Sequence, residues 1–134
     1  MSLKVFIVDD DGVVVFLHKT SLKKSGLSIN PLTFSNGKEA LDYLLKHQDD
    51  EDEYLILLDI NMPIMNGWKF LDEINLKSFA NRVYVVMVTS SIYKNDRDKA
   101  MSYKNVIDFL VKPLNVESSD HVKSLPEIRA YFNN

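Results

Sequence analysis

The chain has 134 residues, of which 46% are hydrophobic and 26% are charged, and its formal net charge at pH 7 is −3. This composition is typical of a globular protein, and the length predicts one domain over residues 1–134 with no room for a second module. The absence of cysteine excludes disulfides and thiolate chemistry. The acidic balance argues against direct binding to nucleic acid, and no apolar stretch is long enough for membrane insertion. Because no export signal begins the sequence, we expect a cytoplasmic protein.

The first apolar run is followed by a row of acids. Leu3–Val8 predicts a strand buried on both faces, and Asp9, Asp10 and Asp11 come directly after it. A solvated turn with a helix N-cap is one interpretation, but a cap needs a single Asp. Three like charges at a strand end therefore mark a candidate site.

The next helix and strand are predicted from their breakers. Gly12–Ser25 is predicted to be a helix that stops at Gly26, although its first residues are good strand formers. Its expected buried face consists of four residues at helical spacing: Val13, Phe16, Leu17 and Thr20. Residues 29–34 predict a short strand, and Pro31 places it at an edge of the sheet because proline cannot donate to a ladder.

A second helix should begin at Asn36, with Glu39 as its capping-box partner. Its expected buried face is apolar: Ala40, Leu41, Leu44 and Leu45. The helix ends before an acidic run at residues 49–53. We interpret that run as a solvated loop and not a metal site, because a flexible segment does not hold carboxylates at ligand geometry.

The apolar run at residues 55–58 stops abruptly at Asp59. It lacks polar alternation, so it predicts a third strand buried on both faces. Pro63 and the pair Asn66-Gly67 then break the backbone, which places Asp59 on the rim of a sheet. A helix over residues 67–78 should follow and bury several apolar side chains: Trp68, Phe70, Leu71 and Ile74.

Two further strands end in polar side chains. Residues 83–88 predict a fourth strand that ends at Thr89, and Val106–Val111 predicts a fifth that ends at Lys112. Between them, residues 96–103 predict a helix. It should be capped by Asn95 and loosely anchored, because the apolar positions in its body are few: Ala100 and Met101.

The tail over residues 116–132 should form a last helix that breaks at Pro126, with a second short helix opening there. Five strands alternating with helices predict a three-layer α/β/α fold with a parallel, doubly wound, flavodoxin-like sheet. The edge strand with Pro31 fits the strand order 2-1-3-4-5.

In such a sheet the carboxyl ends of all strands lie on one edge. That edge would bring together distant residues: Asp9, Asp10, Asp59, Thr89 and Lys112. Clustered carboxylates need raised pKa values or a cation, and an all-oxygen set without His or Cys favours Mg²⁺ over zinc. Asp59 could then attack phosphorus and form an acyl phosphate, while Lys112 and Thr89 hold the phosphoryl oxygens. The three histidines are expected at the surface: His18, His47 and His121.

With these residues in hand, the sequence resembles the receiver domain of two-component response regulators over nearly the whole chain. The shared motifs occur in the family's order: Val-Asp-Asp at 8–10, Leu-Asp-Ile-Asn-Met-Pro at 58–63, Asn-Gly at 66–67, Val-Thr-Ser at 88–90 and Phe-Leu-Val-Lys-Pro at 109–113. Any one motif is weak, whereas five together are highly specific.

The resemblance implies that Asp59 accepts a phosphoryl group from a phosphohistidine of a histidine kinase or phosphotransfer protein. Asp9 and Asp10 would be the acidic pair, holding Mg²⁺ together with Asp59 and the backbone carbonyl of Asn61. Lys112 would pair with the phosphate.

Thr89 and Phe109 resemble the family's hydroxyl-and-aromatic switch. Phe109 stands where tyrosine is usual, so any hydrogen bond from the ring is lost. The resemblance implies a stand-alone receiver, similar to single-domain chemotaxis regulators and without an output domain. It would catalyse only its own phosphorylation and dephosphorylation, and would bind a protein target through its fourth helix, fifth strand and fifth helix.

Residues 101–108 lack the family's usual Gly-Ala and the last helix is interrupted, so the partner-binding face departs from the common pattern. The target, the pathway, the phosphoryl lifetime and a homodimer are left open. One alternative is a phosphatase of the haloacid dehalogenase type, although that family has a second Asp where Asn61 stands. Another is a pseudo-receiver that acts as an unphosphorylated scaffold.

Overall fold

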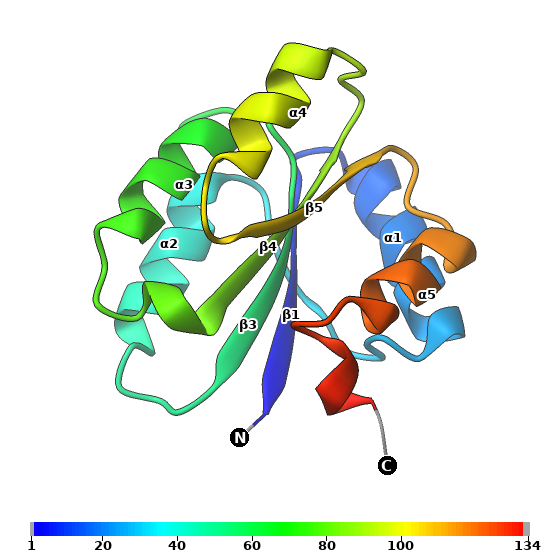
Figure 1. The fold of residues 1–134 in the computed structure, drawn as a ribbon, viewed down its shortest axis with the longest axis horizontal. Coiled ribbons are helices and arrows are strands. Elements are labelled where there is room, and N and C mark those ends of the chain that lie inside the picture. Colours follow the sequence, from blue (N-terminus) through cyan, green and yellow to red (C-terminus); the bar gives the residue numbers. More distant parts are fainter. Residues whose placement is uncertain (1, 133–134) are drawn as a thin grey trace.

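The computed structural model describes residues 2–132, in which strands and helices alternate along the chain (Figure 1). The elements are β1 Leu3–Val8, α1 Gly12–Ser25, β2 Leu32–Phe34, α2 Gly37–Lys46, β3 Glu53–Leu58, α3 Gly67–Asn75, β4 Val83–Thr89, α4 Lys94–Met101, β5 Val106–Val111 and α5 Val116–Ser124. Short 3₁₀ turns lie at Ala80–Arg82 and Arg129–Tyr131. All five predicted strands are present.

The five strands are parallel and lie in the order β2-β1-β3-β4-β5, which confirms the predicted flavodoxin-like topology. Helices α1 and α5 cover one face of the sheet, and α2, α3 and α4 lie on the other (Figure 1). Along β1, Phe6 and Val8 point into the core under α2 and α3, while Val5 and Ile7 point into the core under α1 and α5. Both faces of the strand are therefore buried, which explains its lack of polar alternation.

The predicted buried face of α1 is wrong. Val13 and Phe16 are 69% and 67% exposed, whereas His18, Ser21 and Leu22 are buried. The helix turns a partly polar face inward because the backbone beyond β5 satisfies the His18 and Ser21 side chains. Apolar spacing alone therefore selected the wrong side of this helix.

The caps of the first two helices follow the sequence. Asp11 caps α1 by accepting hydrogen bonds from the Val13 and Val14 amides, and Gly26 ends it at φ 77°. For α2, Asn36 Oδ1 accepts from the Glu39 amide at 3.0 Å. The predicted inner face of α2 is also correct: Ala40, Leu41 and Leu44 are buried and Leu45 is half-buried. The strand β2 is shorter than predicted and starts immediately after Pro31.

Helix α4 is anchored by aromatic stacking next to its C-terminal end more than by an apolar face. It begins at Lys94 without a side-chain cap, so the prediction of a cap at Asn95 is wrong. The half-buried Trp68 of α3 stacks on Tyr103 at 6.4 Å between ring centroids, and Lys99 lies 4.3 Å from the centre of the Trp68 ring. Tyr103 also donates to Asp72 at 2.7 Å. Of the two predicted apolar positions, Ala100 is buried and Met101 is 43% exposed.

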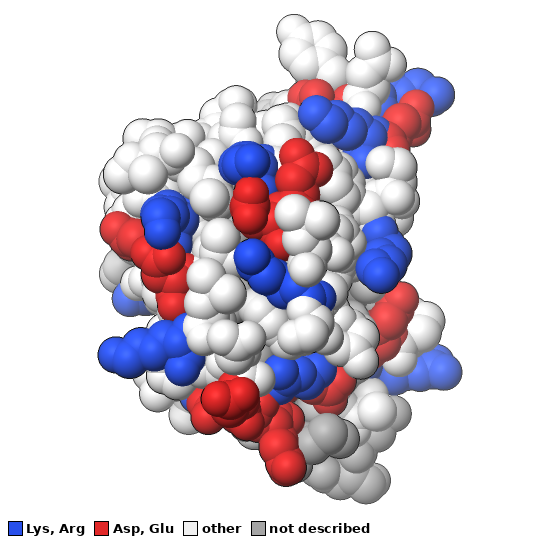
Figure 2. All heavy atoms as spheres, turned by 90° about the vertical axis from the view of Figure 1, so that its left-hand side faces the viewer, with Lys and Arg blue, Asp and Glu red and all other residues white. Residues whose placement is uncertain are grey.

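The chain breaks after Leu125 as Pro126 predicts, but a single 3₁₀ turn replaces the expected second helix. Ile128 is buried, and the Tyr131 hydroxyl donates to Glu53 at the start of β3. No helix among the described residues is both long enough and apolar enough to cross a bilayer. On the face shown in Figure 2, positive and negative side chains are interspersed.

Candidate functional site

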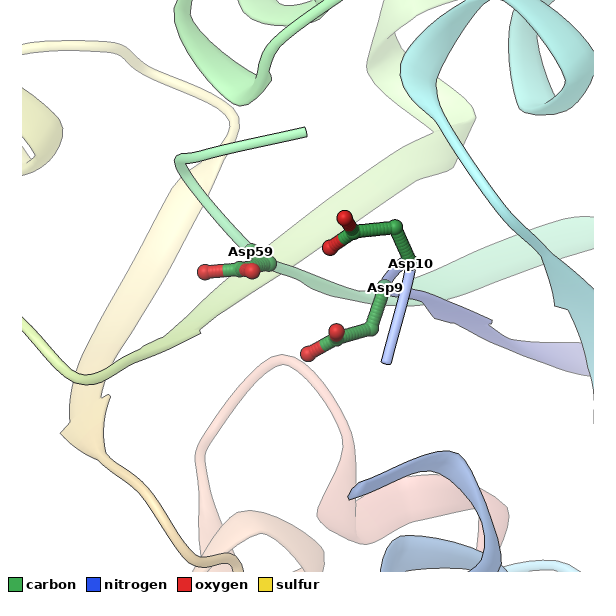
Figure 3. Close-up of side chains that lie close together, drawn as sticks. All are labelled: Asp9, Asp10 and Asp59. Atoms are coloured by element: carbon green, nitrogen blue, oxygen red, sulfur yellow. The ribbon is translucent and has the colours of Figure 1, made fainter. Parts of the chain in front are cut away.

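Three carboxylates meet at the carboxyl edge of the sheet (Figure 3). Asp9 and Asp10 follow β1 and Asp59 follows β3, and one oxygen from each lies within 4.8 Å of the others. Asp9 and Asp59 are only 5% and 6% exposed, while Asp10 is open to solvent. The neighbouring strands thus place side chains that lie some fifty residues apart in sequence against one another, as the topology predicts.

Lys112, at the end of β5, joins two of these carboxylates. Its Nζ lies 2.7 Å from Asp9 Oδ2 and 3.1 Å from Asp59 Oδ2. Burial by itself lowers the pKa of Lys112, but the hydrogen bond to Asp9 and the charges of both carboxylates outweigh it and raise the pKa. The ammonium therefore stays charged and offsets part of the negative charge of the cluster.

Asp59 lies in a restricted environment. Its Oδ1 accepts a hydrogen bond from the Ile60 amide at 2.8 Å, and Lys112 contacts its Oδ2. Burial and the nearby charge of Asp9 raise the pKa of Asp59 above its usual range, against the opposing effect of Lys112. A cation that entered the cluster would favour the ionised form of both carboxylates.

The three acids after β1 have separate positions. Asp11 caps α1, and its amide donates to Asp9 Oδ1 at 2.9 Å. This bond fixes Asp9 facing the cluster, while Asp10 remains on the solvent side. One acid of the row is therefore a cap, as the alternative interpretation held, and the other two join the cluster.

The loop after Asp59 folds back on itself. The Gly67 amide donates to the Ile60 carbonyl at 2.8 Å, and a Cβ at Gly67 would lie 2.4 Å from the Asp59 carbonyl oxygen. Only glycine fits at this close approach of two backbones. Asn61 is exposed in this loop, and the role of its carbonyl as a ligand stays a prediction.

Thr89 and Phe109 belong to the next two strands of the sheet. Thr89 is the last residue of β4, and Phe109 lies within β5. Thr89 is fully buried, and its Oγ1 accepts a hydrogen bond from the Ser91 amide at 3.3 Å. Ser91 in turn donates to Asp96 on α4, so the threonine is linked to that helix. Phe109 is 5% exposed and packs in the core under α3 and α4. Both residues are therefore buried, with the aromatic ring in an inward position, and their role as a switch stays a prediction.

His18 on α1 contacts the backbone segment that follows Lys112, and the sequence did not predict this contact. The Leu114 amide donates to His18 Nε2 at 3.1 Å, and Ser21 donates to the Leu114 carbonyl at 2.9 Å. Burial lowers the pKa of His18, so the ring remains a neutral acceptor. Leu114 follows Lys112 by two residues, and α1 thereby holds the segment that carries the lysine.

The surface expectation for the histidines is thus wrong for His18. His47 is half-buried and stacks on Tyr43, while His121 is exposed and lies 2.9 Å from Asp108. The only signal for His18 is its spacing of three residues from Ser21, which puts both side chains on one helix face. That spacing does not reveal what the face contacts.

The donor set suits one class of cation. Three carboxylates in close reach, one of them exposed, are ligands for a hard divalent ion such as Mg²⁺. Within residues 2–132 the histidines lie on α1, α5 and the end of α2 and do not join this cluster. A zinc site of the usual nitrogen and sulfur ligands is therefore not formed here.

Comparison with known proteins places the chain in a family. The family model of the response regulator receiver domain matches residues 5–121. The chain is 28% identical to the probable methanogenesis regulatory protein FilR2 of Methanothrix harundinacea, over 96% of this chain and 82% of that protein. Other curated relatives are longer, and the chain spans between 6% and 46% of their length.

Solved structures agree. The response regulator receiver protein from Dyadobacter fermentans superposes with a TM-score of 0.80 at 27% identity, covering 98% of this chain and 99% of that one. The phosphorylated cyanobacterial phytochrome response regulator RcpA gives a TM-score of 0.75 at 26% identity, covering 92% of this chain and 97% of that one. The fold, the motifs and the family match agree, and the chain belongs to the receiver domain family of two-component response regulators.

Proposed function

We propose that this receiver domain is a phosphorylation switch in which Asp59 accepts the phosphoryl group. The observation that carries the proposal is the buried Asp59 carboxylate with Lys112 on one oxygen and two further carboxylates within 4.8 Å. This arrangement offers a nucleophile, a fixed cation and a set of oxygen ligands in one place. The solved relative RcpA is described as phosphorylated, which supports the same chemistry here.

The proposed donor is a phosphohistidine on a histidine kinase or phosphotransfer protein, the partners with which receiver domains interact. An Asp59 oxygen attacks phosphorus, the new P–O bond forms as the P–N bond breaks, and the imidazole nitrogen leaves with the electron pair. Lys112 Nζ, now between Asp9 and Asp59, pairs with a phosphoryl oxygen. In this proposal Asp59 is the acceptor and Lys112 is the charge partner of the phosphoryl group. Asp9 holds the lysine in place.

Mg²⁺ would be held by Asp9, Asp10 and Asp59 with the Asn61 carbonyl, and would offset the negative charge of the carboxylates and the phosphoryl group. The chain's own part is to keep Asp9 and Asp59 oriented. The amides of Asp11 and Ile60 do this by donating to their Oδ1 atoms. Each acid thereby keeps its second oxygen free of backbone bonds.

The proposed output is a change in the face formed by α4, β5 and α5. Phosphorylation would draw the Thr89 hydroxyl toward the phosphoryl group and would keep the Phe109 ring in the inward position that it already occupies. Thr89 is coupled to α4 through Ser91 and Asp96, so its movement would shift the start of that helix. The protein target of this face is a separate question from the chemistry at Asp59.

The direct test is incubation with ³²P-labelled acetyl phosphate and Mg²⁺. A separate sample is incubated with a ³²P-labelled phosphotransfer protein. Wild type should take up label, and Asp59→Asn should not. Asp98→Asn is the matched control, because Asp98 is an exposed carboxylate on α4 that pairs with surface Lys94. Equal labelling of Asp59→Asn and wild type would sink the proposal.

The same material separates the two alternatives. A phosphatase would release phosphate from p-nitrophenyl phosphate over many turnovers, whereas the proposed switch would not act on a separate substrate. A scaffold would take up no label, and it would bind its partner equally well with and without acetyl phosphate. The stand-alone receiver without an output domain stays a prediction.

A further inference from the structure

The loop between β3 and α3 carries Asn61, the proposed carbonyl ligand of Mg²⁺, and is attached to its surroundings at few points. The Gly67 amide closes the loop by donating to the Ile60 carbonyl at 2.8 Å. Within residues 2–132, one hydrogen bond reaches the loop from elsewhere in the fold: the Gly37 amide of α2 donates to the Met65 carbonyl at 2.9 Å. The shape of the loop therefore depends on the start of α2.

The loop also contains a strained residue. Ile64 has a φ of 67°, in the left-handed region, and it is the one non-glycine residue with a positive φ in the described part of the chain. A β-branched side chain disfavours this region. Ile64 is 83% exposed, so its own burial does not offset the strain. Such a conformation persists where the flanking structure imposes it, and the bonds at Ile60 and Met65 flank Ile64 on both sides.

The start of α2 is fixed by its own cap. The first amides of a helix have no partner within the helix. The buried Asn36 accepts from the Glu39 amide at 3.0 Å, and Glu39 Oε1 accepts from the Ser35 amide at 3.1 Å. The Gly37 amide is not used by this cap and is the one that donates to Met65.

The packing at this junction leaves little room for a side chain at position 37. A Cβ at Gly37 would lie 3.0 Å from the Met65 carbonyl oxygen and 3.0 Å from the Phe70 Cβ. Phe70 is fully buried in α3 and cannot retreat without disturbing the core. With alanine at position 37, the Met65 carbonyl would therefore have to move by a few tenths of an ångström.

We propose that Gly37 is a positioning residue for the Mg²⁺ site, because its amide holds the strained loop in the conformation that presents the Asn61 carbonyl to the acidic cluster. This inference rests on the proposed function, since it needs the ligands assigned there. Gly37 has no side chain and is not itself a ligand. Mg²⁺ demands near-ideal octahedral geometry, so a small displacement of one ligand weakens its binding.

The acceptor Asp59 is held separately from this loop. Its amide donates to the Val8 carbonyl at 3.0 Å, and its Oδ1 accepts from the Ile60 amide at 2.8 Å. Neither bond involves α2. Loss of the Gly37 bond should therefore lower the affinity for Mg²⁺ and leave the acceptor in place.

The strain at Ile64 predicts a coupling between two positions. When the Met65 carbonyl retreats, Ile64 can relax toward negative φ, and this rotation moves the Asn61 side of the loop. Glycine adopts positive φ without this penalty, so glycine at position 64 removes the driving force for the relaxation. Ile64→Gly should therefore compensate for the loss of the Gly37 bond.

The first test measures Mg²⁺ binding to the full chain by isothermal titration calorimetry. Gly37→Ala should fold, because Gly37 has no positive φ, and should bind Mg²⁺ about tenfold more weakly than wild type. Leu44→Ala is the control for lost stability, because Leu44 is buried on the same helix about two turns further on. It should lower the melting temperature and keep the wild-type affinity. Unchanged affinity in Gly37→Ala, or an equal loss in Leu44→Ala, overturns the proposal.

The second test measures the labelling of Asp59 by acetyl phosphate as a function of Mg²⁺ concentration. Gly37→Ala should need about tenfold more Mg²⁺ for half of its maximal rate, and should reach the wild-type rate at saturation. A rate that stays low at saturating Mg²⁺ would place the effect on the acceptor and overturn the proposal.

Wild type distinguishes the failure of this inference from that of the proposed function. Wild type that binds Mg²⁺ but takes up no label refutes the proposed function, and calorimetry on Gly37→Ala still decides the role of Gly37. Wild type that binds no Mg²⁺ overturns the positioning role as well.

The third test adds Ile64→Gly to Gly37→Ala. The double variant should recover most of the lost Mg²⁺ affinity. Leu76→Gly in the same background is the matched control and should recover none, because Leu76 is similarly exposed, at 78%, but lies after α3. Recovery with both glycine substitutions, or with neither, would show that strain at Ile64 does not move the loop and would overturn the proposal.

Discussion

Lys112 Nζ lies 3.1 Å from Asp59 Oδ2, joining the ends of two strands that are 53 residues apart in sequence. The lysine is shared, because Asp9 Oδ2 lies closer still, at 2.7 Å. This one ammonium contacts two buried carboxylates at a common edge of the sheet. It also marks the place where a phosphoryl oxygen is expected.

Replacing Lys112 by Met should destabilise the protein by about 3 kcal/mol, because Asp9 and Asp59 would remain buried without their cation. Chemical denaturation in EDTA measures the loss. Added Mg²⁺ should stabilise the variant more than it stabilises wild type. A variant as stable as wild type in EDTA would show that the lysine does not neutralise the pair.

Replacing Asp59 by Asn should stabilise the protein at neutral pH by about 1–2 kcal/mol, because a buried charge beside Asp9 is removed. Folding raises the pKa of Asp59 above 3.8, so the folded state binds this proton more readily than the unfolded state. Binding of this proton therefore stabilises the folded wild type at low pH, and this stabilisation is lost as pH rises through the folded pKa. The advantage of Asn should appear as pH rises above about 4 and shrink toward zero below it. Denaturant unfolding across this range measures it, and an advantage that stays constant with pH would contradict the assignment.

Replacing Gly67 by Ala should cost about 3 kcal/mol or more, since the new Cβ would lie 2.4 Å from the Asp59 carbonyl oxygen and the loop must open. Gly12→Ala is the matched control, because a Cβ there meets no atom within 4 Å. The control should be neutral or more stable by about 0.5–1 kcal/mol. Equal melting temperatures for the two variants would refute the close approach.

Replacing His18 by Leu should cost about 2 kcal/mol, because the Leu114 amide loses its buried acceptor. His18→Leu should also slow the labelling of Asp59, because the segment after Lys112 is released. The control Asp98→Asn should not slow it. His18→Gln keeps an acceptor near the Nε2 position and should restore most of the labelling rate. If Gln and Leu behave alike, the histidine acts by packing alone.

The same residue predicts a pH dependence. Burial lowers the pKa of His18 below 6.5 in the folded state, with Asp9 opposing and Lys112 reinforcing the effect. The unfolded state then binds the proton first as pH falls, so stability is lost from about pH 6.5 downward until the folded pKa is reached. Wild type should therefore lose more stability than His18→Gln between about pH 6.5 and 5. Parallel curves for the two proteins would contradict this.

Much of the fold follows from local patterns. Fully apolar strands, Gly26 after α1 and Pro31 before β2 are enough to give the number, direction and order of the strands. Parallel topology then brings Asp9 and Asp59 together without knowledge of any contact. The candidate site was predictable because its residues occupy strand ends, whose positions the topology determines.

What could not be predicted depends on packing between elements. The inner face of α1 is decided by His18 and Ser21 meeting the Leu114 backbone, a contact across 96 and 93 residues of sequence. The position of α4 depends on the stacking of Trp68 on Tyr103, just after the helix ends, and the start of the helix has no capping side chain. Hydrophobic spacing carries no information about such polar and aromatic partners.

The central claim is that the phosphoryl group resides on Asp59, and borohydride trapping tests it most directly. The protein is incubated with acetyl phosphate and Mg²⁺, reduced with borohydride, digested and analysed by mass spectrometry. Reduction of an acyl phosphate converts the aspartate to homoserine, so we expect homoserine at position 59 in wild type and at no other aspartate. Homoserine at Asp9 or Asp10, or none in a protein that has taken up label, would contradict the account.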